Sequence, residues 1–158
     1  MELAVLTGDD PASLVGLAGE PPLLAPGDAV LLGHRTRDLD EGARAETARL
    51  PADLRRIDAA TLMSAPAAAG RRAAAWLAGA GQGVWLHLDL DVLDPDALPA
   101  VTYPQPGGPD WEQLAAVLRP LARSPRLLGV SVADFRPDLD PTGALAARVV
   151  DLLEHALT

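Results

Sequence analysis

Two aspartates, Asp89 and Asp91, lie two residues apart at the end of an apolar stretch, and metal binding is one function that this spacing allows. Between Val84 and Leu93 the even positions are all apolar, whereas His87, Asp89 and Asp91 occupy odd positions. A β-strand with this alternation buries one face and presents the two carboxylates about 7 Å apart on the other. Two negative charges that close repel each other, so a divalent cation between them is favoured. Oxygen ligands suit Mn or Mg better than Zn.

The same residues also allow a purely structural interpretation. A strand that reaches solvent often ends in a turn, and Asp94 and Pro95 are ordinary turn formers. Short acidic patterns are common, so the spacing of the aspartates alone does not decide between a metal site and a turn.

The composition of the chain narrows the range of functions. Its 158 residues, 49% of them apolar, are enough for one domain with a buried core. Cysteine is absent, which excludes disulfides and thiolate ligands, and all thirteen basic residues are arginines. The net charge of -9 argues against nucleic-acid partners. No apolar run reaches the ~18 residues needed to cross a bilayer, so we expect no membrane association and a cytoplasmic protein.

Apolar runs and helix-favouring segments alternate along the chain, which predicts an α/β fold. The expected strands cover residues 28–33, 54–57, 84–93 and 126–133, and the expected helices cover 39–50, 65–79, a segment from Trp111 and a last segment from Pro141. Alternation of this kind implies a mostly parallel sheet with helices on both faces.

The last two helices carry start signals in the sequence. Asp110 and Gln113 have the spacing of a capping box, and Pro120 is expected to end or kink the helix that follows. Asp140 followed by Pro141 predicts the start of the final helix. Its inward-facing residues would be Leu145, Val149, Leu152, Leu153 and Ala156.

The longest distinctive pattern includes the two aspartates. The run LHLDLDVLDPDALPAVTYPQPGG, residues 86–108, resembles the signature of the ureohydrolase family of arginases, agmatinases and formiminoglutamases. In that signature a strand ending in D-x-D precedes D-P and a Pro/Gly-rich loop. The segments GVSVADFRPDLDP downstream and LLGHRTRD upstream resemble neighbouring parts of the family. The resemblance implies a single partial arginase-like domain over residues 1–158, three-layered and incomplete, corresponding to the carboxy-terminal half with the amino-terminal half missing.

The resemblance also implies a chemistry. Family members are Mn-dependent hydrolases of guanidino or amidino carbon–nitrogen bonds, in which two Mn ions activate a shared water. By resemblance, Asp89 and Asp91 are metal ligands. Asp134 falls where many members carry a Glu that contacts the guanidinium of a small substrate, and an ordinary turn residue is the alternative. His87 and Asp94 are expected beside the ligands, where they would orient them without binding the metal.

Part of the family pattern is absent from this sequence. Members carry G-G-D-H and D-A-H-x-D segments that supply further ligands, and neither is present. We therefore expect weak or absent Mn binding, no catalysis by this chain alone, and association with the missing amino-terminal half or with a second copy of the chain. The alternative functions are a non-catalytic structural or regulatory half-domain and one partner of a split enzyme.

A remote alternative is a phosphatase. The string LHLDLDVLD also fits the opening motif of haloacid-dehalogenase-type phosphatases, whose first Asp attacks phosphorus. That motif usually lies near the start of a chain, whereas here it lies past the middle and is followed by DPDALP. The sequence also lacks the Lys that commonly holds the phosphate, so this is the weaker hypothesis.

Overall fold

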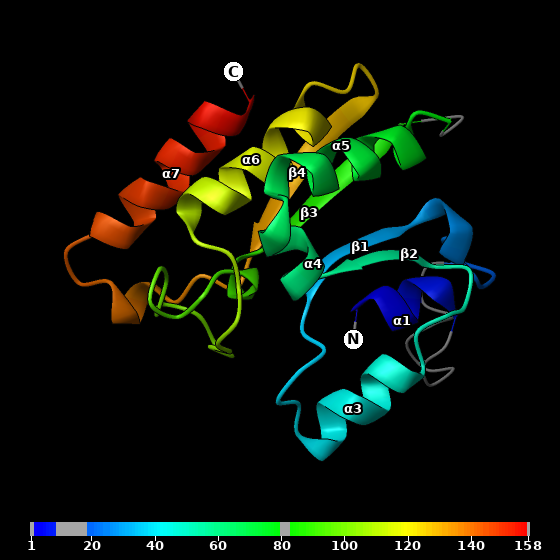
Figure 1. Ribbon diagram of the computed structural model, residues 1–158, viewed down its shortest axis with the longest axis horizontal. Coiled ribbons are helices and arrows are strands. Elements are labelled where there is room, and N and C mark those ends of the chain that lie inside the picture. The colour runs from blue at the N-terminus through cyan, green and yellow to red at the C-terminus, as the bar shows by residue number, and fades with distance from the viewer. Residues whose placement is uncertain (1, 9–18, 80–82, 158) are drawn as a thin grey trace. The chain divides into compact units, whose positions relative to one another are not determined.

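The computed structural model of the chain describes residues 2–8, 19–79 and 83–157 (Figure 1). The strands are β1 (Val30–His34), β2 (Arg55–Asp58), β3 (Val84–Asp89) and β4 (Leu127–Ala133). The helices are α1 (Glu2–Thr7), α3 (Glu41–Ala48), α4 (Ala59–Ser64), α5 (Pro66–Leu77), α6 (Trp111–Ala122) and α7 (Ala144–Leu157). Three short 3-10 helices are η1 (Pro26–Asp28), η2 (Leu90–Val92) and η3 (Pro137–Leu139). Among the described residues, no helix is long and apolar enough to cross a membrane.

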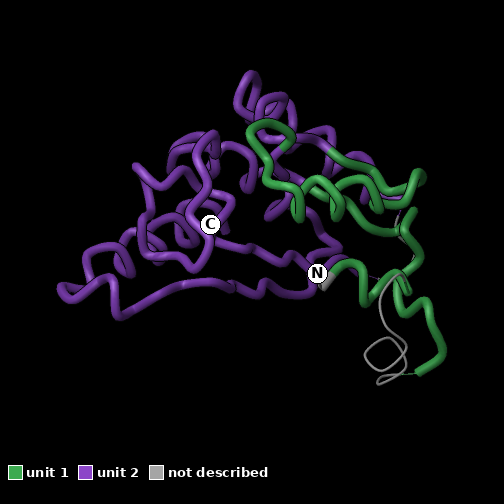
Figure 2. The backbone as a smooth tube through the Cα atoms, turned by 90° about the horizontal axis from the view of Figure 1, so that it is seen from below, with its two compact units in different colours: residues 1–31, 36–56 green, residues 32–35, 57–158 purple. Residues whose placement is uncertain are grey.

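The chain divides into two compact units (Figure 2). The first contains residues 1–31 and 36–56, and the second contains residues 32–35 and 57–158. In the first unit, α3 confirms the helix expected at 39–50. Asp40 caps this helix, because its Oδ1 accepts a 2.8 Å hydrogen bond from the backbone N–H of Ala43. All the acidic residues of the sequence-derived site belong to the second unit.

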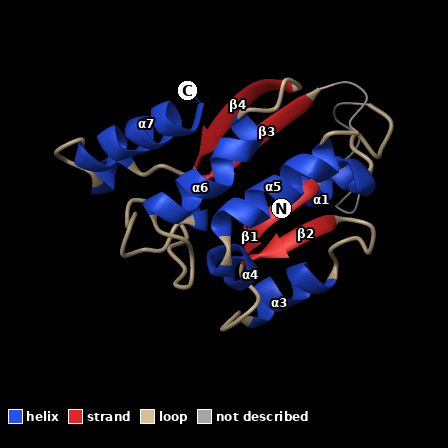
Figure 3. Cartoon of the chain, turned by 45° about the horizontal axis from the view of Figure 1, so that its top comes forward, coloured by secondary structure: helices blue, strands red, loops and turns tan. Residues whose placement is uncertain are grey.

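The second unit is built around a parallel pair of strands, β3 and β4, which confirms the expected strand direction. Val84 lies opposite Leu127, and after a register shift the pairing runs from Trp85 opposite Gly129 to Asp89 opposite Ala133. Parallel neighbours need a crossover connection, and α6 lies within it (Figure 3). Because β3 and β4 are parallel, their carboxyl ends lie side by side, where α/β proteins place their ligands. The strands β1 and β2 pair with each other in a separate two-stranded sheet.

The main core of the second unit lies between β3 and the helices α6 and α7. As the alternation in the sequence predicted, Leu88 is buried while Trp85 and His87 are exposed. The core residues around Leu88 are Leu90, Leu93, Leu98, Ala100, Val101, Leu114, Ala115, Leu118, Val149, Leu152 and Ala156. Complete burial of one leucine side chain stabilises the fold by roughly 1.5–3 kcal/mol. The apolar stripe predicted for the last helix is thus confirmed.

A smaller core joins α4, α5 and α6 within the same unit. Its buried members are Ile57, Leu62, Ala69 and Val117. Gly70 on α5 lies directly against the backbone of Val117 on α6, so a Cβ at position 70 would collide with the Val117 carbonyl. This glycine, which lowers the helix propensity of the segment, is what allows the two helices to approach closely.

The ends of two helices differ from the sequence prediction. The Asp110–Gln113 capping box is confirmed, but α6 continues past Pro120 to Ala122. A proline so near the carboxyl end removes only one of the last helical hydrogen bonds, and the N–H of Arg123 still reaches the Arg119 carbonyl. At the final helix, α7 begins at Ala144 and not at Pro141.

The late start of α7 has a backbone cause. Gly143 has a φ of 72°, in the left-handed region, so residues 141–143 form a turn and a right-handed helix begins only after it. Asp140 still contacts the start of the helix, because its Oδ2 accepts a 2.9 Å hydrogen bond from the N–H of Ala146. The sequence pattern also failed to predict α4, whose start is capped by the side chain of Asp58.

Candidate metal centre

The turn after β3 brings Asp91 beside Asp89. The strand ends at Asp89, whereas the sequence predicted that it continues through Leu93, and Leu90–Val92 form a 3-10 turn. Asp89 Oδ1 accepts a 3.3 Å hydrogen bond from the N–H of Asp91, and Leu93 N–H closes the turn on the Leu90 carbonyl at 3.2 Å. The prediction that both carboxylates lie on one strand was therefore wrong. They converge because of the turn and not because of the strand's pleat.

Asp134, directly after β4, supplies a third carboxylate. Its φ of 61° lies in the left-handed region, which Asp tolerates better than most residues. Both side-chain oxygens accept hydrogen bonds from the backbone N–H of Thr102, at 3.1 and 3.0 Å. The backbone of Asp134 and the loop around Thr102 thus fix the position of this carboxylate.

One carboxylate oxygen from each of Asp89, Asp91 and Asp134 lies within 4.8 Å of the others. The three side chains are only partly buried. Hard divalent cations bind such oxygens at roughly 2.0–2.6 Å, so two ligands on one ion lie at most about twice that distance, roughly 4–5 Å, apart. The donor set therefore fits Mn²⁺ or Mg²⁺ better than Zn²⁺, which prefers nitrogen and sulfur.

The electrostatics of the cluster also favour a bound cation. The pKa of Asp91 is raised from 3.8 to about 6, mainly by burial and then by the neighbouring charges of Asp89 and Asp134, against an opposing effect of Arg35. The carboxyl group of Asp91 is therefore destabilised in its charged form when no cation is present. A divalent ion at the cluster would reverse this effect, because it favours the charged form.

Arg35 holds the polypeptide around this cluster and was not predicted from the sequence as a site residue. Its guanidinium donates to the carbonyls of Asp91 and Leu93, at 3.4 and 3.3 Å, just after β3. It also donates to Gln105 and Pro106 in the Pro/Gly-rich loop, at 2.9 and 3.2 Å. One side chain thus connects the turn that carries Asp91 to the loop that follows it. The only signal in the sequence was the resemblance of LLGHRTRD to a family segment.

Both the sequence and the fold of the chain match those of known proteins. A family model described as the arginase family matches residues 7–157. The chain belongs to the arginase family. It is 30% identical to the arginase of Bacillus subtilis over 160 residues, covering 99% of this chain and 52% of that protein. It is 33% identical to the N(omega)-hydroxy-L-arginine amidinohydrolase of Streptomyces lavendulae, covering 82% and 42% of the two chains.

A solved structure agrees with this assignment. The arginase of Bacillus caldovelox superposes with a TM-score of 0.84 and 26% identity, over 99% of this chain and 52% of that chain. The incomplete arginase-like α/β fold expected from the sequence is thereby confirmed. The chain spans about half the length of the arginase-family relatives it matches.

The two residues expected beside the ligands have partners of their own. Asp94 accepts hydrogen bonds from the N–H groups of Asp96 at 3.0 Å and Gly107 at 2.8 Å, and these bonds lower the pKa of Asp94. His87 Nδ1 lies 2.8 Å from Ser131 Oγ on β4. Within the described ranges, neither residue belongs to the three-carboxylate group. Asp94 thus organises the loop in this arginase-family chain, and the orienting roles of both residues remain predictions.

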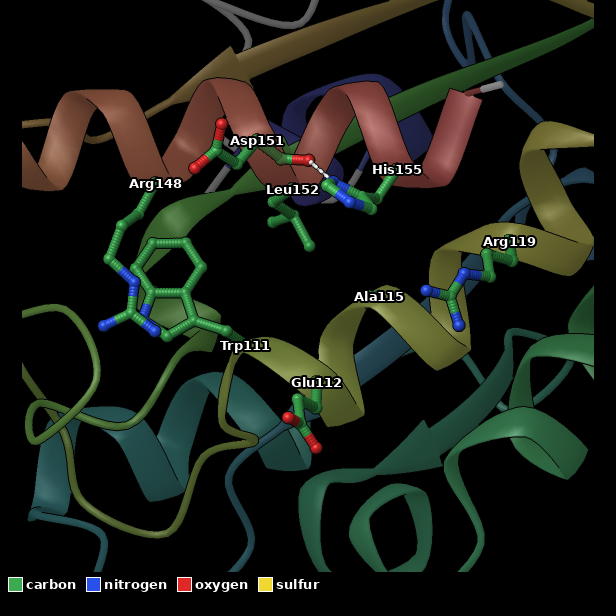
Figure 4. Close-up of a pocket in the computed structure, with 8 residues that line it drawn as sticks. All are labelled: Trp111, Glu112, Ala115, Arg119, Arg148, Asp151, Leu152 and His155. Carbon is green, nitrogen blue, oxygen red and sulfur yellow. Dashed lines mark hydrogen bonds between the residues drawn. The ribbon is translucent and has the colours of Figure 1, made fainter.

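A pocket of about 570 Å³ lies elsewhere, between α6 and α7 (Figure 4). Leu152 and Ala115 are among its apolar residues, and the guanidinium of Arg148 lies 4.9 Å from the centre of the Trp111 ring at one side. None of the three clustered aspartates lines it. The pocket is therefore separate from the residues that the arginase-family pattern singles out.

Proposed function

We propose that this chain is one half of an arginase-family hydrolase of guanidino or amidino carbon–nitrogen bonds, and that Asp89, Asp91 and Asp134 bind Mn²⁺. The observation that carries the proposal is the convergence of three carboxylate oxygens within 4.8 Å in a chain of this family. The names of its relatives, arginase and N(omega)-hydroxy-L-arginine amidinohydrolase, support arginine-like compounds as the substrate class.

The residues of this chain contribute mainly charge and position. A bound Mn²⁺ supplies a Lewis acid that lowers the pKa of water near neutral pH. Asp91 would lose its proton as the ion binds, because its raised pKa leaves part of it protonated near pH 6. The backbone N–H of Thr102 holds Asp134 through two hydrogen bonds, and Arg35 holds the backbone carbonyls of Asp91 and Leu93. The proposed site is therefore preorganised by its own loops.

We further propose that the chain alone is inactive. Three carboxylates leave most of the coordination shell of a divalent ion to water, and a second ion would need ligands of its own. Among the described residues, no histidine joins the three-carboxylate group. Activity would then require residues that lie outside this chain.

Metal binding is tested by titrating the purified chain with MnCl₂ and following heat of binding and thermal unfolding. We expect weak but saturable binding that is lost in the double variant Asp89→Asn with Asp91→Asn. These substitutions keep the shape of the side chains while removing two charges. The matched control, Asp28→Asn with Asp53→Asn, removes two charges from exposed acids elsewhere and should bind Mn²⁺ as the unaltered chain does. Equal binding by both double variants would reject the site.

Catalysis is tested by release of urea or ammonia from arginine, agmatine and formiminoglutamate in the presence of Mn²⁺. The chain alone should give no release above the background of the Asp89→Asn, Asp91→Asn variant. Turnover that disappears in that variant would reject the proposal of inactivity while supporting the assigned metal ligands.

A further inference from the structure

The pocket between α6 and α7 has an apolar floor. Ala115 on α6 and Leu152 on α7 line it, and both are buried. Because Ala115 carries only a methyl group, space that a larger side chain would fill stays open. The volume of about 570 Å³ falls in the range of roughly 300–1,000 Å³ that is typical of small-molecule sites. All the residues that line the pocket belong to the second unit.

An indole ring forms one end of the pocket and is held from two directions. Nε1 of Trp111 donates a 3.2 Å hydrogen bond to the carbonyl of Ala97. The guanidinium of Arg148 lies 4.9 Å from the centre of the ring, within the range of a cation–π contact. A ring fixed in this way has little freedom left to lose when a ligand packs against it. Trp111 therefore offers a preorganised apolar surface.

The opposite end of the pocket carries the side chains of Arg119 and His155 (Figure 4). Arg119 follows Trp111 by eight residues on α6, which is roughly 12 Å along the helix axis. His155 follows Arg148 by seven residues on α7, which is roughly 10 Å along that axis. A ligand that spans the pocket would thus meet a ring at one end and nitrogen donors at the other.

The donors at this end have capacity left for a ligand. His155 Nδ1 lies 2.7 Å from the backbone carbonyl oxygen of Asp151, which can only accept, so Nδ1 donates to it. The second ring nitrogen, Nε2, remains for a ligand and donates when the ring is protonated. Arg119 is exposed, and among the residues that the structure describes no carboxylate forms an ion pair with it.

The two acidic side chains of the pocket do not occupy this end. In Figure 4 the carboxylate of Glu112 extends from α6 on the side away from α7, and that of Asp151 lies against α7 near Arg148. The chain as a whole has a net charge of -9 and repels anions, so only a local group of positive side chains could hold one. A guanidinium binds a carboxylate through two parallel hydrogen bonds, which gives Arg119 a specific preference for this group.

We propose that the pocket binds a small aromatic carboxylic acid. Its carboxylate contacts Arg119 and His155, its short apolar chain lies over Leu152, and its ring packs against Trp111, because aromatic rings attract one another in offset or edge-to-face arrangements. The site shares no residue with the three-carboxylate group. It is therefore a binding function beyond the proposed hydrolase chemistry and does not depend on it.

The proposal is tested by NMR titration of the full chain labelled with ¹⁵N, in EDTA so that metal binding plays no part. The probes share one phenylbutyl body and differ in charge: 4-phenylbutyrate, 4-phenylbutanol and 4-phenylbutylamine. The indole N–H signal of Trp111, assigned with Trp111→Phe, should shift saturably with the acid. We expect the acid to bind at least about tenfold more tightly than the alcohol or the amine, because hydrogen bonds between charged groups are the stronger ones. Trp85 does not line the pocket, so its indole signal is the internal control.

Substitutions on α6 provide the second test. Arg119→Gln removes the charge from an exposed side chain and should weaken binding of the acid at least about tenfold, to the level of the alcohol. The matched control is Arg123→Gln, the same change on an exposed arginine just after α6 that does not line the pocket, and it should leave the affinity unchanged. Ala115→Leu fills the floor and should abolish binding of all three probes. Circular dichroism checks the folding of each variant, and Arg119→Gln decides the outcome if Ala115→Leu unfolds.

Four results would overturn the inference. They are an unmoved Trp111 signal with excess acid, equal affinity for the acid and the alcohol, tighter binding of the amine, and an Arg119→Gln variant that binds the acid as the unaltered chain does. A Trp111 signal that moves with protein concentration alone would also reject it, since a second copy of the chain would then cover the pocket. Because the titration contains no Mn²⁺, its result is independent of the proposed metal site.

Discussion

Gly108 lies directly against the guanidinium of Arg35, closer than any side chain at position 108 would allow. A Cβ built on Gly108 would collide with this guanidinium, with the Val92 carbonyl and with the N–H of Asp94. The glycine therefore lets the Pro/Gly-rich loop close over the arginine that holds the turn carrying Asp91. The presence of glycine at position 108, the last residue of the run 86–108, thus has a steric explanation that does not involve a metal.

Gly108→Ala should destabilise the second unit by roughly 1–3 kcal/mol, as overpacking does in a closely packed region. Chemical denaturation followed by circular dichroism measures the change. Gly79→Ala is the matched control, because a Cβ at that position meets nothing within 4 Å, and its effect should stay within about 0.5 kcal/mol. Equal stability of the two variants would show that the loop moves to accommodate the methyl group.

Arg35→Lys should also destabilise the loop, although it keeps the positive charge. A lysine ammonium lacks the planar set of donors with which Arg35 reaches carbonyls in three segments, so several of these bonds would be lost. We expect a loss of roughly 2 kcal/mol in the free energy of unfolding. Arg37→Lys, on an exposed side chain, is the control and should be neutral. A neutral Arg35→Lys variant would show that charge alone matters at position 35.

The fold followed from the sequence where periodicity is strong. The alternation around Leu88 and the stripe that includes Val149 and Leu152 each describe one buried face, and burial follows directly from such patterns. The turn after Asp89 could not be predicted from the sequence. Leu90 is fully buried as the first residue of a 3-10 turn, and an apolar residue would be expected to be buried equally well as the next residue of the strand. Only the tertiary packing of that leucine distinguishes the two.

The candidate site was also only partly predictable. Asp89 and Asp91 were found because neighbours in sequence stay neighbours in space. Asp134 is far away along the chain, and it joins them because β4 lies in parallel register beside β3. Sequence spacing carries no information about such a contact. The prediction that Asp134 contacts substrate remains a prediction, and its place in the carboxylate cluster adds a second possible role.

The raised pKa of Asp91 predicts how stability changes with pH. Its pKa of about 6 in the folded chain lies above the ordinary 3.8, so the folded state binds this proton more tightly than the unfolded state. The stabilisation from this group is complete below about pH 4 and is lost as the pH rises through about 6. In EDTA, the free energy of unfolding of the unaltered chain should therefore fall more steeply between pH 4 and 7 than that of Asp91→Asn. Parallel curves would contradict the assignment of the shift to Asp91.

The same shift makes Mn²⁺ binding dependent on pH in the opposite direction. The ion must displace the proton of Asp91, so the affinity should rise between about pH 5 and 7 and level off above the pKa. Calorimetric titration at each pH, in buffers of differing protonation enthalpy, measures both the affinity and the proton released. An affinity that does not change across this range would place Asp91 outside the metal site.

Asp134 offers a way to separate a structural role from a metal-binding one. Asp134→Asn keeps an acceptor for the N–H of Thr102 and tolerates the left-handed backbone at φ 61°, so its stability should match the unaltered chain within about 0.5 kcal/mol. Asp134→Ala loses both features and should cost roughly 1–2 kcal/mol.

The affinity for Mn²⁺ should not follow the stability of these two variants. Both lack the carboxylate charge, so both should bind Mn²⁺ at least about tenfold more weakly than the unaltered chain, regardless of their stability. Calorimetry below the melting transition of each variant measures this affinity on folded protein. If Asp134→Asn bound Mn²⁺ as tightly as the unaltered chain, the third carboxylate would only support the Thr102 loop, and the metal site would rest on the two residues of the β3 turn.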